Sequence, residues 1–291
     1  MKVISVTPRG YCHGVVNAVE IAKKTASNPD TPRPIYILGQ LVHNHYIVEE
    51  LEKYGVISLE NSSSRAELLA DISKGTVIFT AHGVSPQVKE AAKAKGLNCV
   101  DTTCSDVEKT HLLIKELAAK DFDIIYIGKK GHPEPEGCIG EAPNHVFLIQ
   151  DEKDLEFLVL PQTERLALTT QTTLSRWDTS ALVEKVKQKY PNIKIHVDIC
   201  LATQQRQDAA ATQTGDAEVV FVVGDIHSSN TNRLAEVVRN QVHKTVYLID
   251  SVNDIKPEMV SGKKTAAVTS GASTPTNVTR EVIKYLEGYS D

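Results

Sequence analysis

The sequence has 291 residues, of which 41% are hydrophobic and 24% are charged, so it can bury sizeable cores. Its formal net charge of −5 argues against general nucleic-acid binding. It has no apolar run of about 18 residues for a membrane span, and it opens on a predicted strand rather than a signal peptide. We therefore expect a cytoplasmic protein, in which the odd number of five cysteines argues against a disulfide framework.

In chain order, the predicted elements repeat three times. An apolar run leads to Cys12, Cys104 and Cys200, which are spaced by close to a third of the chain. Each cysteine is followed by a helical pattern and then by further apolar runs. The runs that predict strands lie at 3–6, 36–39, 56–59, 99–103, 126–128, 146–149, 193–200, 221–224 and 246–249, and one more run in each third ends at Thr80, Thr169 or Thr269. The predicted helices cover 17–26, 86–95, 107–120, 175–190, 232–242 and 276–287.

This alternation of strands and helices predicts an α/β fold. Strand, helix and strand in succession favour mainly parallel sheets with helices on their faces. The three repeats indicate three similar α/β units, each the size of a small domain. In such sheets ligands bind beyond the carboxyl ends of the strands, where the recurring polar residues and cysteines of this sequence also fall.

The three repeated cysteines predict a metal site. If the units meet around a pseudo-threefold axis, Cys12, Cys104 and Cys200 converge on one point. Structural zinc sites normally contain a close cysteine pair, and no CxxC motif is present. Three thiolates without a local fourth favour a 4Fe-4S cluster with one iron open to substrate. The alternative is three unrelated buried cysteines, as we expect for Cys99 and Cys138, which we assign to packing.

The loop 131–137 contains the candidate acid. Its prolines fix the backbone and would hold His132 and Glu134 rigidly. Near a metal, a carboxylic acid at Glu134 could deliver a proton to substrate. We expect Glu136, in contrast, to be solvated at a helix start.

The remaining polar loops predict an anion site. Hydroxyls, imidazoles and amides at helix starts suit a phosphate or diphosphate, although each alone is more often a helix cap. No Walker A or GxGxxG motif is present, so nucleotide binding has no support. The candidate ligands are His43, His82, His132, Thr172, Thr173, Ser228, Ser229, Asn230 and Ser273.

Together these motifs resemble the 4-hydroxy-3-methylbut-2-enyl diphosphate reductase family over essentially the whole chain. The matching segments are 8–15, 42–44, 81–85, 131–137, 170–175, 198–203, 228–230 and 271–273. The resemblance implies a cloverleaf of three pseudo-threefold-related α/β domains around a central iron–sulfur cluster. It also implies that each cysteine strand joins the sheet that precedes it, which gives domains at 13–104, 105–200 and 201–291, the last completed by the N-terminal strand 1–12.

The resemblance further implies the reaction. The substrate 4-hydroxy-3-methylbut-2-enyl diphosphate would lose its hydroxyl to give isopentenyl and dimethylallyl diphosphate, with two electrons passing singly through the cluster from a ferredoxin or flavodoxin. His43, His82, Ser228, Asn230 and Ser273 would hold the diphosphate. Glu134 would protonate the leaving hydroxyl, with Thr172 and His132 ordering the hydrogen bonds.

The sequence departs from the family's usual pattern near two cysteines. The family usually has Asp-Ala-Thr-Cys-Pro around the second cysteine, whereas this chain has Thr102 in place of the alanine and Ser105 in place of the proline. His13 follows Cys12, where a small or aromatic residue is commoner. We expect these departures to affect cluster stability or redox potential rather than activity. Two alternatives stay open: a three-cysteine 4Fe-4S enzyme of the quinolinate synthase type, and a non-enzymatic iron–sulfur redox sensor.

Overall fold

The computed structural model describes residues 1–60, 64–161 and 164–289. The strands are β1 (Lys2–Ser5), β2 (Ile35–Leu38), β3 (Val56–Leu59), β4 (Thr76–Phe79), β5 (Asn98–Asp101), β6 (Asp123–Ile127), β7 (Val146–Ile149), β8 (Leu166–Thr170), β9 (Lys194–Ile195), β10 (Val219–Val223), β11 (Thr245–Ile249) and β12 (Thr265–Ser270). The helices are α1 (His13–Ser27), α2 (His45–Glu52), α3 (Arg65–Ala70), α4 (Pro86–Ala94), α5 (Ser105–Ala118), α6 (Pro133–Glu141), α7 (Glu152–Phe157), α8 (Arg176–Lys189), α9 (Leu201–Gln213), α10 (Ser229–Val237), η1 (Val238–Val242), η2 (Val252–Asp254), α11 (Pro257–Val260) and α12 (Thr276–Gly288). Within this described part of the chain, no helix combines the length and apolarity needed to cross a membrane.

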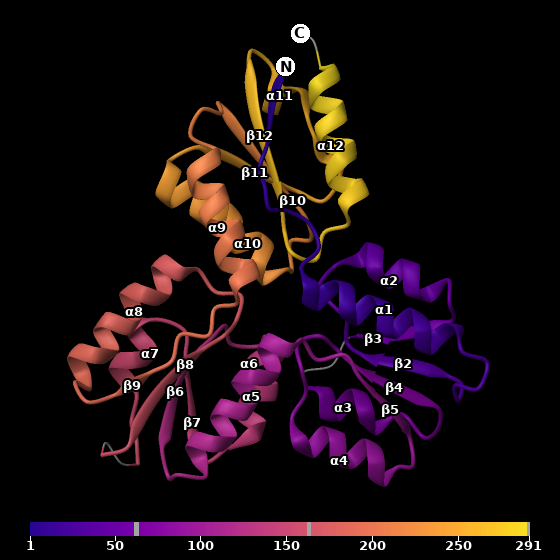
Figure 1. Ribbon diagram of the computed structural model, residues 1–291, viewed down its shortest axis with the longest axis vertical. Coiled ribbons are helices and arrows are strands. Elements are labelled where there is room, and N and C mark those ends of the chain that lie inside the picture. The colour runs from indigo at the N-terminus through magenta and orange to yellow at the C-terminus, as the bar shows by residue number, and fades with distance from the viewer. Residues whose placement is uncertain (61–63, 162–163, 290–291) are drawn as a thin grey trace. The chain divides into compact units, whose positions relative to one another are not determined.

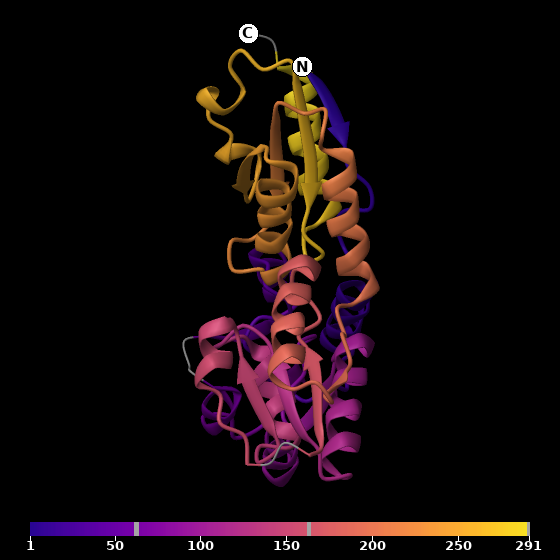
Figure 2. The same ribbon diagram turned by 90° about the vertical axis from the view of Figure 1, so that its left-hand side faces the viewer.

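The chain forms two compact units. The terminal unit contains residues 1–15, 43–46 and 200–291, and the central unit contains residues 16–42 and 47–199. The terminal unit holds one parallel sheet of order β1-β12-β10-β11. In both views the N-terminal strand β1 (indigo) lies beside β12 (Figure 1; Figure 2). The ammonium group of Met1 donates to the carbonyls of Leu286 and Tyr289, so the two ends of the described chain are joined in this unit.

The sheet of the terminal unit is buried on both faces. Strand β10 is a continuous apolar run in which every residue is buried, as expected for a central parallel strand. Because successive side chains point to opposite faces, Val219, Phe221 and Val223 pack with α12, while Val220 and Val222 pack with α9 and α10. These two layers fix the carboxyl end of the sheet, where the candidate site residues of this unit lie.

The central unit contains two further parallel sheets. Their orders are β3-β2-β4-β5 and β7-β6-β8-β9. Ile125 and Ile127 pack toward α8 on one face of the second sheet, and Ile124 and Tyr126 pack toward α5 and α6 on the other. The predicted α/β fold with parallel sheets is therefore confirmed. In each of the three sheets the strand that precedes a cysteine occupies one edge, and this includes β1 beside β12.

The predicted strand over 193–200 is wrong beyond its first residues. It pairs with β8 only over Lys194–Ile195, and His196 N then donates to Leu168 O at 2.8 Å. Asp198 turns to side chains instead: its N–H donates to Thr170 Oγ1 at 3.0 Å, and its carboxylate accepts from the hydroxyl of Thr169. Because these side-chain bonds replace the ladder, the chain leaves the sheet before Cys200.

The predicted helix over 232–242 also differs from the observed one. Helix α10 begins earlier, at Ser229, because Ser228 caps it by accepting from Thr231 N at 3.4 Å. Its end is the π-helical turn η1, which stops at His243 in the left-handed conformation with φ 56°. The early start places Ser229 and Asn230 in the first turn of the helix, where their positions are fixed.

Candidate active site

Glu134 lies in the first turn of a helix and not in a loop, which corrects the prediction for 131–137. His132 is the N-cap of α6, and its Nδ1 accepts from Glu134 N at 3.1 Å. Pro133 follows at the first helical position, where a missing N–H costs nothing and the fixed φ suits the helix. Glu134 is fully buried, so the cap and the proline together hold its carboxyl inside the central unit.

Thr172 holds both oxygens of the Glu134 carboxyl. Thr172 N donates to Oε1 at 2.7 Å, and Thr172 Oγ1 lies 3.0 Å from Oε2. Burial raises the pKa of Glu134 to about 7; the hydrogen bonds from Thr172 oppose the rise and the Asp198 carboxylate adds to it. A carboxyl with a pKa near neutrality can both hold and release a proton under ordinary conditions, as a general acid requires.

His82 joins this group from the end of β4. The rings of His82 and His132 meet edge to face, with 5.0 Å between their centroids. The loop that carries His82 is fixed because Ala81 N donates to Leu41 O and Cys104 N donates to Ala81 O. Thr173, also predicted, accepts from the amide of Gln171 at 3.1 Å. The central unit thus groups His82, His132, Glu134 and Thr172 at the carboxyl ends of its strands.

Helix α6 is anchored to its neighbours through close contacts. A Cβ added at Gly140 would lie 2.2 Å from Ser85 Cβ, so only glycine permits this approach of α6 to the start of α4. The prediction that Glu136 is solvated is wrong: Glu136 Oε1 accepts from Arg65 N at 2.8 Å, and its Oε2 forms a 3.6 Å ion pair with the Arg65 guanidinium. These contacts fix the helix that carries Glu134.

The three repeated cysteines all stand at helix N-termini. Cys12 directly precedes α1, and Cys104 and Cys200 are the N-cap residues of α5 and α9. Cys200 Sγ accepts from Thr203 N at 3.4 Å. Helix N-termini favour the thiolate, and thiolates are the usual ligands of iron–sulfur clusters. None of the five cysteines forms a disulfide, so this donor set fits such a cluster.

The other two cysteines pack in cores, as predicted. Cys138 is fully buried on α6, where burial, with a contribution from the Glu134 carboxylate, raises the pKa of its thiol well above the ordinary value. Cys99 lies on β5, packs against the core of its sheet, and has its thiol pKa raised by burial. Both thiols therefore resist ionisation.

The terminal unit groups the predicted hydroxyls and amide. Ser228, Ser229, Asn230 and Ser273 are each at least nine-tenths buried. Ser273 Oγ donates to His43 O at 3.1 Å and lies 3.4 Å from Ser228 Oγ. The Nδ2 atom of Asn230 is buried and has no hydrogen-bond partner among the described residues. A bound anion would satisfy that donor.

Two structural features bring these hydroxyl and amide side chains together. A Cβ at Gly271 would lie 2.1 Å from Thr231 Oγ1, so glycine lets the loop of Ser273 approach the start of α10. Thr203 Oγ1 lies 3.1 Å from Cys200 Sγ and 3.4 Å from Asn230 Oδ1, which connects the cysteine to the amide. The terminal unit thus contains Cys12, His43, Cys200, Ser228, Ser229, Asn230 and Ser273.

Sequence reasoning missed the residues that position this set. His45, two residues after His43, has its Nδ1 4.0 Å from Asp225 Oδ2 and its Nε2 3.4 Å from Asp250 Oδ2. These contacts hold the segment 43–46 in the terminal unit. Only the recurrence of an acid after β10 and β11 could have signalled this contact. Arg206 was missed because its partners are far away in the sequence.

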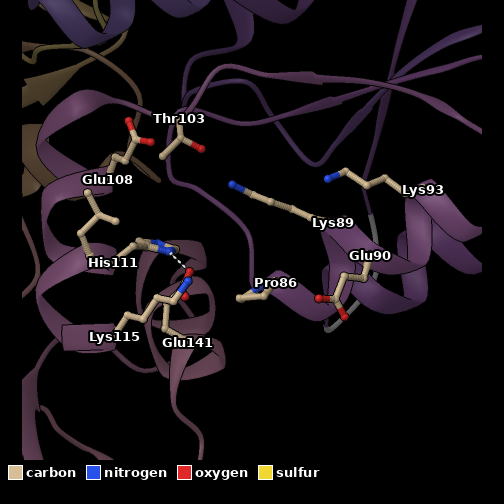
Figure 3. Close-up of a pocket in the computed structure, with 10 residues that line it drawn as sticks. Pro86, Lys89, Glu90, Lys93, Thr103, Glu108, His111, Lys115 and Glu141 are labelled. Carbon is tan, nitrogen blue, oxygen red and sulfur yellow. Dashed lines mark hydrogen bonds and ion pairs between the residues drawn. The ribbon is translucent and has the colours of Figure 1, made fainter. Parts of the chain in front are cut away.

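A cleft of about 290 Å³ lies beside α4, α5 and α6 (Figure 3), and Glu134 is not among the residues that line it. Its inner wall includes His111, whose Nδ1 lies 2.8 Å from Glu141 Oε1. The His111 ring also lies against Gly83 and Gly137. One side chain of α5 thereby packs beneath both the loop of His82 and the helix of Glu134.

We expect His111→Ala to destabilise the fold by about 3 kcal/mol, because it leaves a cavity and removes the partner of Glu141. Chemical denaturation of the protein measures this change. Leu112→Ala is the matched control, since Leu112 is 55% exposed on the same helix and should stay within about 0.5 kcal/mol of the original. Equal stabilities for the two variants would contradict the packing role.

Comparisons with known proteins agree with this geometry. The 4-hydroxy-3-methylbut-2-enyl diphosphate reductase of Symbiobacterium thermophilum is 54% identical over 290 residues, which cover 100% of this chain and 98% of that protein. The protein of the same name from Macrococcus caseolyticus is 50% identical over 292 residues, covering 99% and 90%. The solved structure of the E-1-hydroxy-2-methyl-but-2-enyl-4-diphosphate reductase from Plasmodium falciparum is similar with a TM-score of 0.90 and 33% identity, over 99% of this chain and 88% of that one. A family model described as LytB protein matches residues 3–287, and the chain belongs to this LytB family.

Proposed function

We propose that this protein is an oxidoreductase that removes the hydroxyl of 4-hydroxy-3-methylbut-2-enyl diphosphate and yields isopentenyl and dimethylallyl diphosphate. The relatives named for this reductase match the chain over its whole length, which supports the reaction over the synthase-like and sensor alternatives. The observation that carries the proposal is the buried carboxyl of Glu134, whose pKa is raised to about 7 by burial. That group is suited to protonating a leaving hydroxyl.

The proposed cofactor is a 4Fe-4S cluster bound by Cys12, Cys104 and Cys200, with its fourth iron open to substrate. Support comes from the type of donor, from the helix N-terminus that each thiol shares, and from membership of the family. When bound, the cluster would supply electrons one at a time and a Lewis-acidic iron. A ferredoxin or flavodoxin is the proposed donor, because each transfers single electrons.

The polar residues would bind and orient the substrate. We assign the diphosphate to His43, His82, Ser228, Asn230 and Ser273, with Ser229 and Thr173 beside them. The buried, unpartnered Nδ2 of Asn230 supports an anionic ligand. His132, held as the N-cap of α6, would order the hydrogen bonds around Glu134.

Glu134 would deliver the proton through the contact that the structure shows. Its Oε2 lies 3.0 Å from Thr172 Oγ1, so a protonated carboxyl can donate to the hydroxyl, which can pass its own proton on. The C–O bond breaks as the hydroxyl leaves as water, and two electrons enter the allylic fragment. A second proton then adds to either end of that fragment, which balances the reaction and accounts for both products.

The proposed reaction is tested by product analysis. The protein, reconstituted anaerobically with iron and sulfide, is incubated with the allylic diphosphate and a chemical reductant. Isopentenyl and dimethylallyl diphosphate should form only when protein, substrate and reductant are all present. A fully loaded protein that leaves the substrate unchanged would contradict the proposal.

The pH dependence of turnover should report on Glu134. An acid must be protonated to act, so the rate should fall as the pH rises through about 7, where this carboxyl ionises. Thr172→Val removes the hydroxyl that would relay the proton, so the rate should fall at every pH. It also removes the side-chain hydrogen bond that lowers the pKa of Glu134 but keeps the backbone one, so the descending limb of the remaining rate should move to higher pH. Single-turnover rates between pH 6 and 9 measure both profiles. A descending limb at the same pH in both proteins would contradict the assignment.

A further inference from the structure

Arg206 is a buried cation held by neutral groups. It lies on α9 and is only 5% exposed. Its Nε and Nη2 donate to Gly10 O at 3.2 and 2.6 Å, Nη2 also donates to Tyr11 O at 3.2 Å, and Nη1 donates to Ala202 O at 2.9 Å. Every one of these acceptors is a backbone carbonyl. The guanidinium therefore ties the segment before Cys12 to the first turns of the helix that begins after Cys200.

The charge of Arg206 has no carboxylate to balance it among the described residues. Its hydrogen bonds instead hold it beside two cysteines, because Tyr11 directly precedes Cys12 and Ala202 lies two residues after Cys200. A buried charge without an opposite charge nearby is destabilising. This arrangement is stabilised once the two cysteines carry negative charge.

We propose that Arg206 positions Cys12 and Cys200 and serves as the fixed positive charge that raises the reduction potential of the cluster they hold. This inference rests on the proposed cluster. Adding one electron to a metal centre adds one negative charge, which a nearby buried cation stabilises more than it stabilises the oxidised state. The hydrogen-bond fork fixes the position of this cation, since arginine stays protonated and its donors are rigid.

Two substitutions separate charge from hydrogen bonding. Arg206→Gln removes the charge but keeps N–H donors, whereas Arg206→Lys keeps the charge and loses the fork. Both proteins are reconstituted anaerobically, their iron and sulfide are measured, and the midpoint potential is determined by a redox titration followed by EPR. Arg239→Gln is the control, because Arg239 is an exposed arginine of the same unit.

At the original midpoint, the ratio of reduced to oxidised cluster should fall about tenfold in Arg206→Gln, which corresponds to about 59 mV for one electron. This ratio should fall less in Arg206→Lys and should stay unchanged in Arg239→Gln. Iron loss in Arg206→Gln with retention in Arg206→Lys would also support the role of the charge. An unchanged midpoint in a loaded Arg206→Gln protein, or iron loss in both variants, would overturn it. Failure of the original protein to bind iron would instead contradict the proposed cofactor.

Discussion

Replacing Glu134 with glutamine is expected to lower turnover at least about 100-fold, because the neutral amide cannot supply the proton that the leaving hydroxyl needs. Glutamine has the same shape and can still accept from Thr172 N and donate to Thr172 Oγ1. Iron content, diphosphate affinity and the cluster spectrum should therefore stay unchanged. Anaerobic steady-state kinetics with both substrate-binding and product assays measure the effect.

The control for this variant is Glu136→Gln, on the same helix. Glu136 is half-buried and paired with Arg65, and it lies outside the proposed proton path, so its loss should leave turnover within a few-fold of the original. Turnover close to the original in Glu134→Gln would show that another group donates the proton.

The stability of Glu134→Gln should distinguish lost chemistry from lost folding. A carboxyl whose pKa is raised in the folded state contributes stability below its ordinary pKa, and this contribution is lost as the pH rises through about 7. The original protein should therefore lose stability between about pH 4.5 and 7 and change little above that, whereas the variant, which does not ionise, should not show this loss. Denaturation across this range measures the difference.

Serine at Cys12, Cys104 or Cys200 should prevent assembly of the cluster, because a neutral hydroxyl is a poor ligand for iron. Each single variant is expected to lose most of its iron and sulfide and, with them, all measurable reduction of the substrate. Metal analysis after anaerobic reconstitution gives the result directly.

Cys99→Ala and Cys138→Ala are the matched controls for the three serine variants. Cys99 and Cys138 pack in cores, so their removal should lower stability slightly and leave the iron content unchanged. Full iron in any of the three serine variants would contradict the assignment of that ligand. Iron loss in the Cys99 or Cys138 variant would show that the ligands had been wrongly chosen.

The sheets and the polar groups at their ends followed from local patterns. Strand β10 is predictable because a run of β-branched and aromatic residues in a parallel sheet is buried on both faces. The length of β9 was not predictable, because its pairing ends where Asp198 forms hydrogen bonds with Thr169 and Thr170. These contacts depend on how two strands align.

In the candidate site, too, contacts between distant parts of the chain could not be predicted from local sequence patterns. The prolines around Glu134 indicated a rigid segment, but they also marked a helix start, and the burial that raises its pKa comes from packing with residues far along the chain. His111 and Arg206 could not be found from the sequence. The role of each depends on partners from other elements, such as Gly10 for Arg206, and no local motif encodes such a contact.

The central claim is a cluster that passes electrons to an allylic diphosphate, and one anaerobic experiment tests it. Iron and sulfide are counted, the Mössbauer spectrum is recorded, and the reduced protein is mixed once with substrate. The account predicts about four irons per chain, one of them spectroscopically distinct, and oxidation of the cluster in step with product formation. Absence of iron after reconstitution, or a full cluster that the substrate does not oxidise, would contradict it.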